Sequence, residues 1–292
     1  MKRTIVQRTA HQFWYHPTSS TPGHFSFSIL LLFLAQIRSL LRLKTIAFFN
    51  VKGGVGKTTS AVNIAYLAAQ SDIRTILWDL DPQSCATWNL GIDDDSAHKA
   101  IRVFKGKTPV GQLKLHSPYR GLDVIPADLS LRKLEVLLGS EEDSQKLLDR
   151  LAEHLSEQNK LLIFDCAPAY SKLSENIFSC CDVLVVPLLP SPLSLRSYAQ
   201  LKTFLAGKKQ WKKLRLQPFF TMVDKRRKIH TDVLEQAKEL IDEEEPLVIP
   251  YASDYEKMGT HRAPIHCFAN SSAAAKAYQS LWSTLQDRFQ LQ

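Results

Sequence analysis

A glycine-rich loop directly behind an apolar run is the feature that most restricts how this chain can fold. Thr45–Asn50 is typical of a buried strand, and a stretch with helical periodicity begins at Thr58. Between them lie Gly53, Gly54 and Gly56. Glycines let the backbone N–H groups of such a loop curve around an anion, and the helix amino terminus adds the positive end of its dipole. The sequence therefore predicts a strand, a phosphate-binding loop and a helix in succession.

Strands and helices alternate along the chain from Lys44 onward. Short apolar runs predict strands at residues 45–50, 75–78, 122–125, 161–164, 183–187, 217–223 and 247–249. Helical periodicity predicts helices at residues 58–69, 129–138, 144–155, 193–205, 230–241 and 272–289. This alternation predicts an α/β fold with a mostly parallel sheet and helices on both faces. No repeat or low-complexity linker interrupts it, so we expect one nucleotide-binding domain at residues 44–292.

Residues 1–43 differ in composition from the rest of the chain. They hold five Lys and Arg side chains and no acid, and their apolar run from Phe25 to Leu34 is interrupted soon afterwards by Arg38. That run is shorter than the roughly 20 residues that span a bilayer, and no secretory cleavage site follows it. The composition is also similar to that of an organelle transit peptide. We interpret residues 1–43 as an extension, either a disordered appendage or a stretch upstream of the natural start.

The overall composition is that of an ordinary globular protein. The chain is 45% hydrophobic and 23% charged, which excludes a disordered or collagen-like chain. Its formal net charge is +8, of which the extension contributes +5, so residues 44–292 carry only +3. Any binding of nucleic acid must therefore depend on a local basic patch.

The loop departs from the plain phosphate-binding pattern in one informative way. The pattern G-x-x-x-x-G-K-[ST] requires glycine where this chain has Val51, and Lys52 stands directly before the glycines. The resulting stretch K-G-G-x-G-K-T-T resembles the deviant Walker A box of the ParA and MinD superfamily of P-loop NTPases. The likeness covers about residues 44–292 and is to small ParA proteins without an N-terminal helix-turn-helix domain. It implies ATP and Mg²⁺ as cofactors.

The loop residues take defined roles in phosphoryl transfer, which depends mainly on positioning and on stabilising negative charge. Lys57 is expected to contact the β and γ phosphates, and the Thr58 hydroxyl to ligate Mg²⁺. The resemblance implies that Lys52 reaches across the interface of an ATP-dependent homodimer to the partner's phosphates. The backbone N–H groups that line the cradle are expected from Gly53, Gly54, Val55, Gly56, Lys57, Thr58 and Thr59.

Acidic residues end two of the predicted strands. Asp79 and Asp81 lie in a D-x-D-P-Q segment that resembles a ParA switch, in which Asp81 would orient the attacking water and Asp79 would support the magnesium shell. Asp165 ends the apolar run 161–164 as in a Walker B segment and would hold Mg²⁺ through water. The segment that follows resembles the D-x-P-P switch of the family, with alanine at the first proline. Such aspartates taken singly are often only helix caps or turn formers.

The resemblance continues into the C-terminal half. Thr221–Arg226 is similar to the T-M-x-D-x-R segment of the family, and Pro250 lies where the resemblance places the adenine. Ten basic residues gather between positions 202 and 228, with Asp224 as the sole acid: Lys202, Lys208, Lys209, Lys212, Lys213, Arg215, Lys225, Arg226, Arg227 and Lys228. Such a patch would bind DNA phosphates without reading bases. Arg226, Arg227 and Lys228 are the candidate DNA contacts, and a solvated surface is the alternative.

Three functions follow from the resemblance. The first is a cytoplasmic, nucleoid-associated ATPase that partitions a plasmid or chromosome with a ParB-like partner, with slow, partner-stimulated hydrolysis. The second is a positioning ATPase that uses the same cycle with a cargo adaptor. The third is a MinD-like membrane switch, which would need a basic amphipathic tail. Residues 277–292 are apolar at helical spacing but have few basic side chains, so we expect them to pack on the sheet and expect no membrane partner.

Overall fold

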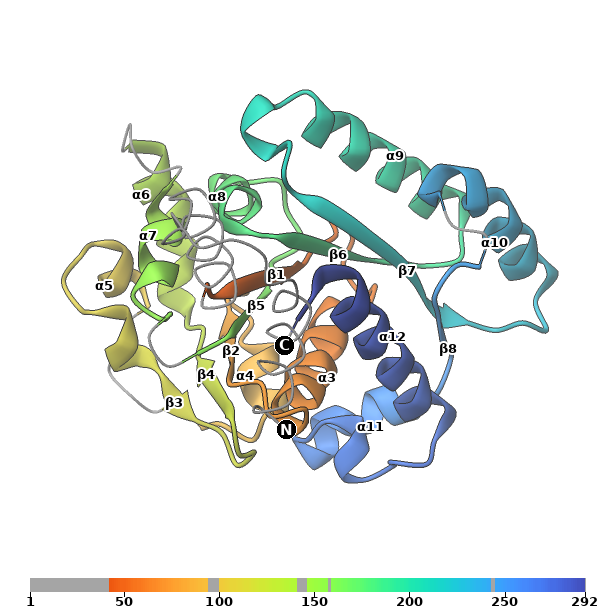
Figure 1. Cartoon of the computed structure of the whole chain (residues 1–292), viewed down its shortest axis with the longest axis horizontal. Helices are drawn as coiled ribbons and strands as arrows, with labels where there is room; N and C mark the ends of the chain where they lie inside the picture. Colours follow the sequence, from red (N-terminus) through yellow and green to blue (C-terminus); the bar gives the residue numbers. More distant parts are fainter. Residues whose placement is uncertain (1–41, 94–99, 141–145, 157–158, 243–244, 292) are drawn as a thin grey trace, which may run out of the picture. The chain divides into compact units, whose positions relative to one another are not determined.

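Within the residues that the computed structural model describes, which are 42–93, 100–140, 146–156, 159–242 and 245–291, eight strands form one sheet (Figure 1). The strand order is β3-β4-β2-β5-β1-β6-β7-β8. The strands are β1 Lys44–Phe48, β2 Thr75–Asp79, β3 Leu115–His116, β4 Leu122–Ile125, β5 Leu161–Asp165, β6 Val183–Leu188, β7 Arg215–Val223 and β8 Val248–Pro250. Only β3 pairs antiparallel within this described sheet. The mostly parallel sheet predicted from the sequence is confirmed.

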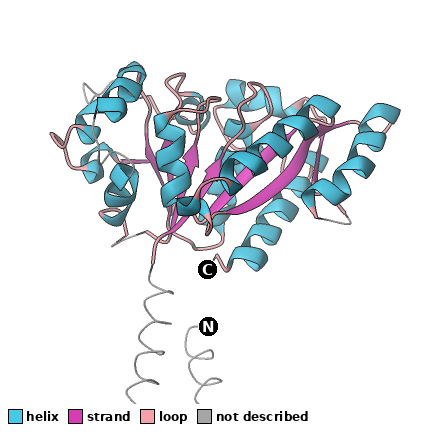
Figure 2. Cartoon of the chain, turned by 90° about the horizontal axis from the view of Figure 1, so that it is seen from above, coloured by secondary structure: helices cyan, strands magenta, loops and turns pink. Residues whose placement is uncertain are grey.

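Helices cover both faces of the sheet, as Figure 2 shows. One face packs against α3 Lys57–Gln70, α4 Cys85–Asn89, α11 Asp254–His261 and α12 Ala273–Phe289. The other packs against α5 Ile101–Phe104, α6 Leu134–Ser140, α7 Leu147–Glu153, α8 Lys172–Cys180, α9 Pro192–Ala206 and α10 Lys228–Ile241. The 3-10 helices are η1 Val110–Leu113, η2 Leu129–Lys133, η4 Lys209–Trp211 and η5 Ile265–Cys267.

Burial on both faces explains why the central strands are continuously apolar. In β1, Ile46 and Phe48 contact the cluster of α3 and α12, while Ala47 contacts the cluster of the opposite face. All three are fully buried, as expected for a parallel strand covered by helices on both sides. β1 lies between β5 and β6 at the centre of the sheet, so the loop after it opens at the middle of the sheet's carboxyl edge.

The last helix packs as the sequence predicts. Five large side chains of α12 are buried in the core on the α3 face: Tyr278, Leu281, Trp282, Leu285 and Phe289. Tyr278 also lies 3.1 Å from the Ser60 hydroxyl of α3, oxygen to oxygen, and the indole nitrogen of Trp282 donates to Ser71 at 3.0 Å. The apolar face of this helix is therefore committed to the core.

Several elements differ from the sequence-based prediction. The helix predicted at 129–138 is η2 followed by α6, and the helix predicted at 144–155 begins at Leu147. β3, α8 and α11 were not predicted; β3 has only two residues, which is too short for a periodic signal. The predicted extension falls almost wholly on residues 1–41, which lie outside the described residues, so its boundary stays a prediction.

Candidate functional site

The loop after β1 has the backbone shape of a phosphate cradle. Gly54 and Gly56 adopt φ values of +70° and +87°, a left-handed conformation that side chains other than glycine rarely tolerate. Gly56 is the N-cap of α3, so the left-handed turn places the loop at the amino end of that helix. No described atom lies within 4 Å of where a Cβ on Gly53 or Gly54 would stand. The cradle is thus open on the side where a polyphosphate would approach the backbone N–H groups.

Two residues that the sequence analysis gave no role hold this loop in place. The Asn50 side chain is buried, donates to the Pro187 carbonyl of β6 at 2.7 Å, and accepts from the Lys52 N–H at 3.0 Å. The Thr221 hydroxyl of β7 donates to the Val55 carbonyl at 2.9 Å. The role of Asn50 could have been inferred from the sequence, because it is a polar residue at the end of an apolar strand. The contact of Thr221 could not, because it depends on the order of the strands in the sheet.

Lys52 and Lys57 lie on either side of the loop glycines, and a hydrogen bond connects the side chain of Lys57 to the backbone of Lys52. Lys57 is only 7% exposed, and its ammonium group donates to the Lys52 carbonyl at 3.0 Å. Burial lowers the pKa of Lys57, an effect opposed by the nearby charge of Asp165. Lys52 itself is half-buried. The geometry therefore keeps one lysine inside the loop and leaves the other at its rim.

Asp165 and Thr58, the two residues for which the sequence analysis expects a magnesium role at this loop, contact each other. The Thr58 hydroxyl donates to Asp165 Oδ2 at 2.7 Å, which connects the start of α3 to the end of β5. Asp165 is fully buried, and its Oδ1 has no hydrogen-bond partner among the described residues. Burial, followed by the charge of Asp79, raises the pKa of Asp165 well above its usual range. A buried carboxylate oxygen without a donor, beside a threonine hydroxyl, is a donor set suited to Mg²⁺.

Asp79 lies next to Asp165, but both of its carboxylate oxygens accept hydrogen bonds. The two residues are register partners on β2 and β5. Asp79 Oδ2 accepts from both the backbone N–H and the hydroxyl of Thr87, at 2.9 and 2.8 Å, and its Oδ1 accepts from the Asp81 N–H at 3.1 Å. Burial raises the pKa of Asp79 to about 6. Both oxygens therefore fasten the Asp81 loop to α4, and support of the magnesium shell by Asp79 stays a prediction.

The remaining predicted nucleotide contacts lie at the same edge of the sheet. Asp81 is half-buried and accepts from the Gln83 N–H at 3.0 Å, so its water-orienting role stays a prediction. Pro250 ends β8, and its carbonyl accepts from the Tyr255 hydroxyl at 2.7 Å. The adjacent Tyr251 is 64% exposed. Contact between Pro250 and an adenine also stays a prediction.

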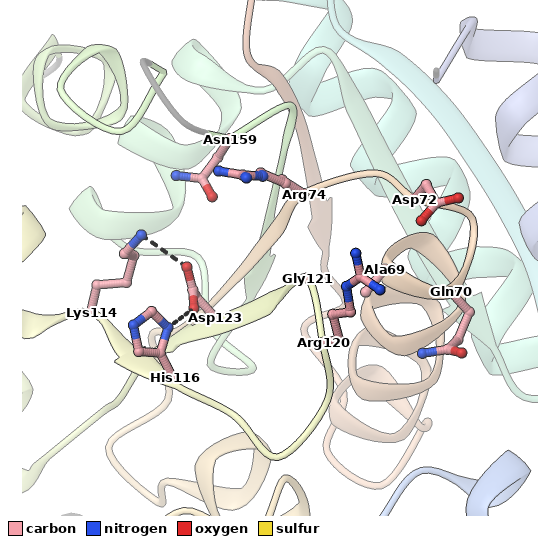
Figure 3. A pocket seen from close by; sticks show the side chains of 10 residues that line it. All are labelled: Ala69, Gln70, Asp72, Arg74, Lys114, His116, Arg120, Gly121, Asp123 and Asn159. Carbon is pink, nitrogen blue, oxygen red and sulfur yellow. Dashed lines mark hydrogen bonds and ion pairs between the residues drawn. The ribbon is translucent and has the colours of Figure 1, made fainter. Parts of the chain in front are cut away.

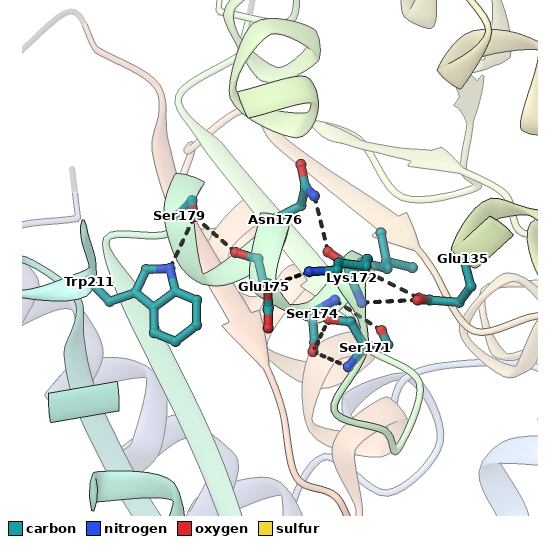
Figure 4. Close-up of polar contacts among 9 residues, drawn as sticks. Glu135, Ser171, Lys172, Ser174, Glu175, Asn176, Ser179 and Trp211 are labelled. Atoms are coloured by element: carbon teal, nitrogen blue, oxygen red, sulfur yellow. Dashed lines mark hydrogen bonds and ion pairs between the residues drawn. The ribbon is translucent and has the colours of Figure 1, made fainter. Parts of the chain in front are cut away.

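The helix that follows the Asp165 segment is anchored at its start, as Figure 4 shows. Ser171 and Ser174 form a reciprocal capping box at the first turn of α8. The Glu135 carboxylate of α6 accepts from the N–H groups of Lys172 and Leu173 at 2.9 and 3.2 Å. These contacts tie α6 to the residues directly behind the predicted switch.

The ten basic residues do not form the single patch that the sequence suggests. Lys208, Lys209, Lys212, Lys213 and Arg215 lie at the amino end of β7, and we call them the amino-end group. Residues 225–228 follow the carboxyl end of the same strand, and we call them the carboxyl-end group. Strand β7, labelled in Figure 1, begins at the amino-end group and ends beside the carboxyl-end group. Its nine residues rise about 26 Å along the strand. Lys202 is engaged elsewhere, because its ammonium group donates to the Leu240 carbonyl.

Arg226 lies in the carboxyl-end group but is paired. Its guanidinium donates to both carboxylate oxygens of Asp224 at 2.9 Å, while its side chain stays 88% exposed. These hydrogen bonds lower the pKa of Asp224 to about 2. Arg227 and Lys228 are also exposed. The three predicted DNA contacts are therefore accessible, with the charge of Arg226 partly balanced.

None of the helices in the described part of the chain has both the length and the apolar character needed to cross a membrane.

Comparison with known proteins identifies a family and several relatives that this chain matches. The family described as "AAA domain" matches residues 43–217. The chain is 30% identical over 243 residues to the sporulation initiation inhibitor protein Soj of Bacillus subtilis, covering 82% of this chain and 96% of Soj. It is 29% identical over 246 residues to the chromosome partitioning protein ParA of Caulobacter vibrioides, covering 82% and 92%.

A solved structure shows the same architecture. The cobyrinic acid a,c-diamide synthase of Mycobacterium smegmatis, determined with a bound ATP analog and magnesium, superposes with a TM-score of 0.71. It is 25% identical, and the match covers 85% of this chain and 96% of the synthase. The similarity therefore covers most of the chain.

Proposed function

Because this chain belongs to the ParA/MinD family of P-loop ATPases, we propose that it partitions DNA through an ATP-dependent cycle. In this cycle the protein binds ATP with Mg²⁺, dimerises, binds DNA without sequence preference, and hydrolyses ATP slowly until a ParB-like partner stimulates it. The observation that carries the proposal is the hydrogen bond between Thr58, at the start of α3, and the buried Asp165 beside the glycine loop. It combines a phosphate cradle with a magnesium donor set at one point of the sheet.

ATP and Mg²⁺ fit the residues present. Asp165 Oδ1, which has no hydrogen-bond partner in the described part of the chain, and the Thr58 hydroxyl would hold the metal, directly or through water. When bound, Mg²⁺ neutralises charge on the phosphates and so favours transfer of the terminal phosphoryl group. The bound magnesium and ATP analog of the synthase from Mycobacterium smegmatis support this assignment.

The chain's own groups then act on the phosphates. The backbone N–H groups from Gly53 to Thr59 bind the phosphate oxygens, assisted by the amino end of α3. Lys57 exchanges its hydrogen bond to the Lys52 carbonyl for one to a phosphate oxygen and stabilises the charge there. Asp81, held by the Asp79 contacts, orients the attacking water. Excluding bulk water strengthens each of these electrostatic contacts.

Dimerisation would complete the site with Lys52 of a second copy. Exposed apolar side chains gather at the carboxyl edge of the sheet, which also carries the glycine loop. Tyr170, Leu193, Ile229 and Tyr251 follow β5, β6, β7 and β8, and their exposed fractions are 46, 65, 49 and 64%. Exposed apolar surface around a polar centre is typical of an interaction face. This arrangement supports self-association over the nucleotide.

The carboxyl-end group supplies the proposed DNA contacts. Arg226, Arg227 and Lys228 are exposed at the same edge of the sheet as the glycine loop. A dimer formed at that edge would bring two such groups together, and phosphate binding strengthens with each added cation. DNA affinity would therefore follow the nucleotide state and place the protein on the nucleoid.

The membrane alternative has less support. A membrane switch needs an amphipathic helix whose apolar face is free to enter lipid. The apolar face of α12, which includes Leu281, Trp282 and Leu285, is buried against the sheet. A cargo-positioning role would use the same cycle with a different partner, so it is distinguished by the partner and not by the site.

The test measures binding to random-sequence duplex DNA without nucleotide, with Mg·ADP and with Mg and a slowly hydrolysed ATP analogue, across a salt series. We expect tight binding only with the ATP analogue, weakened severalfold by Arg226→Ala. Lys209→Ala in the amino-end group is the matched control and should leave binding unchanged. Absence of DNA binding in every nucleotide state would overturn the DNA step, while a measured ATPase activity would still support the nucleotide site.

A further inference from the structure

A pocket lies at the amino edge of the sheet, away from the glycine loop. Its volume is about 480 Å³, and its lining includes Arg74 and Gly121, which directly precede β2 and β4. The glycine loop follows the carboxyl end of β1, so the parallel strands separate the two sites. Volumes of this order accommodate a small organic molecule. This amino-edge pocket is therefore distinct from the proposed ATP site.

The turn at Gly121 lines the pocket beside the end of α3 and has a backbone conformation that favours glycine. This residue has φ +83°, and a Cβ placed on it would lie 3.7 Å from the Ala69 carbonyl at the end of α3. The Gly121 carbonyl accepts from the Thr75 N–H at 2.9 Å. The turn before β4 is thus held against the end of α3, and Ala69 and Gly121 both line the pocket (Figure 3).

One carboxylate in the pocket is fully engaged by two neighbouring groups. Lys114 lies 2.8 Å from Asp123 Oδ2, and His116 Nδ1 lies 2.6 Å from Asp123 Oδ1. The short antiparallel strand β3 brings these residues together, because His116 is the register partner of Asp123. Figure 3 shows the three side chains gathered on one side of the pocket. Asp123 is therefore not free to neutralise a further cation.

Two arginines, Arg74 and Arg120, also line the pocket. Neither Arg74 nor Arg120 makes a side-chain ion pair or hydrogen bond to any residue that the structure describes, and both are exposed. Figure 3 shows Arg74 on the side of Asn159 and Arg120 on the side of Gln70 and Asp72. With Lys114 and Asp123 paired, Asp72 is the sole acid among the described residues lining the pocket that has no ion pair with a described residue. The lining thus has an excess of positive charge and unused donors.

We propose that this amino-edge pocket binds a small organic anion that carries carboxylate or phosphate groups, held by Arg74 and Arg120. A guanidinium presents a planar fork of N–H donors that matches either group with two parallel hydrogen bonds. Two guanidiniums that have no partner among the described residues, in one concave site, fit a ligand with at least two acidic groups. The polar lining disfavours an apolar ligand.

The test uses isothermal titration calorimetry on the full chain saturated with Mg·ADP, so that the glycine loop is occupied. One arm titrates tricarballylate, which has only carboxylates, and the other fructose 1,6-bisphosphate, which has only phosphates as acidic groups. Saturable binding of either probe, weakened at least tenfold by Arg74→Ala/Arg120→Ala, supports the proposal and identifies the acidic group. The matched control is Arg102→Ala/Arg132→Ala, which removes the same charge from exposed positions outside the pocket.

The double variant is first checked for a wild-type unfolding midpoint and for Mg·ADP binding. If it does not fold, Arg74→Gln/Arg120→Gln replaces it, since glutamine keeps the polar side chain and loses the charge. Failure of both probes to bind at millimolar concentration would overturn the proposal. Equal binding by wild type and the double variant would overturn it as well.

Discussion

The two buried aspartates at the ends of β2 and β5 differ in how their oxygens are used. Three donors from the chain occupy both oxygens of Asp79, whereas Asp165 receives only the Thr58 hydroxyl among the described donors. A buried carboxylate without sufficient donors is costly unless a cation compensates it. The unequal hydrogen bonding therefore favours Asp165 as the proposed magnesium ligand and Asp79 as the residue that holds the Asp81 loop.

The first prediction concerns Asp165→Asn. The amide keeps an acceptor for the Thr58 hydroxyl but loses the charge that would hold Mg²⁺. We expect ATP hydrolysis to fall on the order of 100-fold, since the metal supplies several kcal/mol of charge stabilisation. The free energy of unfolding without Mg²⁺ should not fall, because burial disfavours the charged carboxylate. Asp149→Asn, at an exposed position of α7, is the control for both measurements.

The second prediction concerns the pair formed by Asp224 and Arg226. Asp224→Asn keeps an oxygen that accepts from the Arg226 N–H and removes the balancing charge. We expect tighter DNA binding in the ATP state and a salt dependence steeper by roughly one phosphate contact. Weaker DNA binding by this variant would contradict the expectation that Asp224 reduces DNA binding by balancing the charge of Arg226.

The pH dependence of this pair follows from the low pKa of its carboxyl group. Asp224 has a folded pKa lowered to about 2 by its hydrogen bonds with Arg226. A lowered folded pKa means that the contribution to stability is complete above the unfolded value of about 4 and is lost as the pH falls through 2. DNA titrations between pH 6 and 8 should therefore show no change that comes from this pair.

At the scale of elements, the two ends of the proposed nucleotide site are joined by a contact between α4 and α11. The Arg262 guanidinium lies 4.0 Å from the centre of the Trp88 ring and pairs with Asp93 at 2.6 Å. The Trp88 indole N–H donates to the Gly259 carbonyl at 3.0 Å. α4 follows the Asp81 loop, and α11 follows the segment around Pro250. Trp88 therefore connects the helix that follows Asp81 to the helix that follows Pro250.

The third prediction is a destabilised contact in Arg262→Ala. We expect the free energy of unfolding in urea to fall by about 1 kcal/mol, since a cation over an indole ring contributes roughly that much at a partly exposed site. Arg262→Lys should recover only part of it, because lysine lacks the planar fork that also reaches Asp93. Tryptophan emission on addition of Mg·ADP provides the second readout, and Trp88→Phe identifies the share that comes from Trp88.

The fourth prediction concerns the anchor of α8. Glu135→Ala removes the carboxylate that accepts from the N–H groups of Lys172 and Leu173. We expect the free energy of unfolding to fall by about 1 kcal/mol, the usual effect of losing a helix cap and its favourable charge. Chemical denaturation measures it, with Glu153→Ala on the exposed surface of α7 as control. Equal stability of the two variants would show that the capping box alone anchors the helix.

Features of this chain that depend on neighbouring residues were predictable from the sequence, whereas features that depend on the order of the strands were not. The loop glycines and the strand-end position of Asp165 were predictable, because each is defined by its immediate neighbours in the chain. The hydrogen bond from Thr221 to the loop was not, since it requires knowing that β7 lies near the end of β1. The prediction of a single basic patch was wrong, because the basic residues lie at the two ends of the extended strand β7 and are therefore far apart in space.

At the scale of the whole molecule, the two basic groups face different edges of the sheet. The carboxyl-end group shares its edge with the glycine loop and with exposed Tyr251. The amino-end group lies at the other end of β7, which rises about 26 Å, at the edge that also carries the amino-edge pocket. Only a cation near the nucleotide edge can be brought beside its counterpart by dimerisation at that edge. Nucleotide-dependent DNA binding should therefore depend on one group alone.

The fifth prediction compares two variants with equal loss of charge. Lys225→Gln/Arg227→Gln/Lys228→Gln alters the carboxyl-end group, and Lys208→Gln/Lys209→Gln/Lys212→Gln alters the amino-end group. We expect the first variant to lower the slope of log affinity against log salt by up to about 3 in the ATP state, near 0.9 per lost phosphate contact. The second should keep the wild-type slope, because its positions lie at the far edge. If the second variant lost DNA binding instead, the DNA would lie along the amino edge, and ATP would have to control it without placing DNA beside the nucleotide.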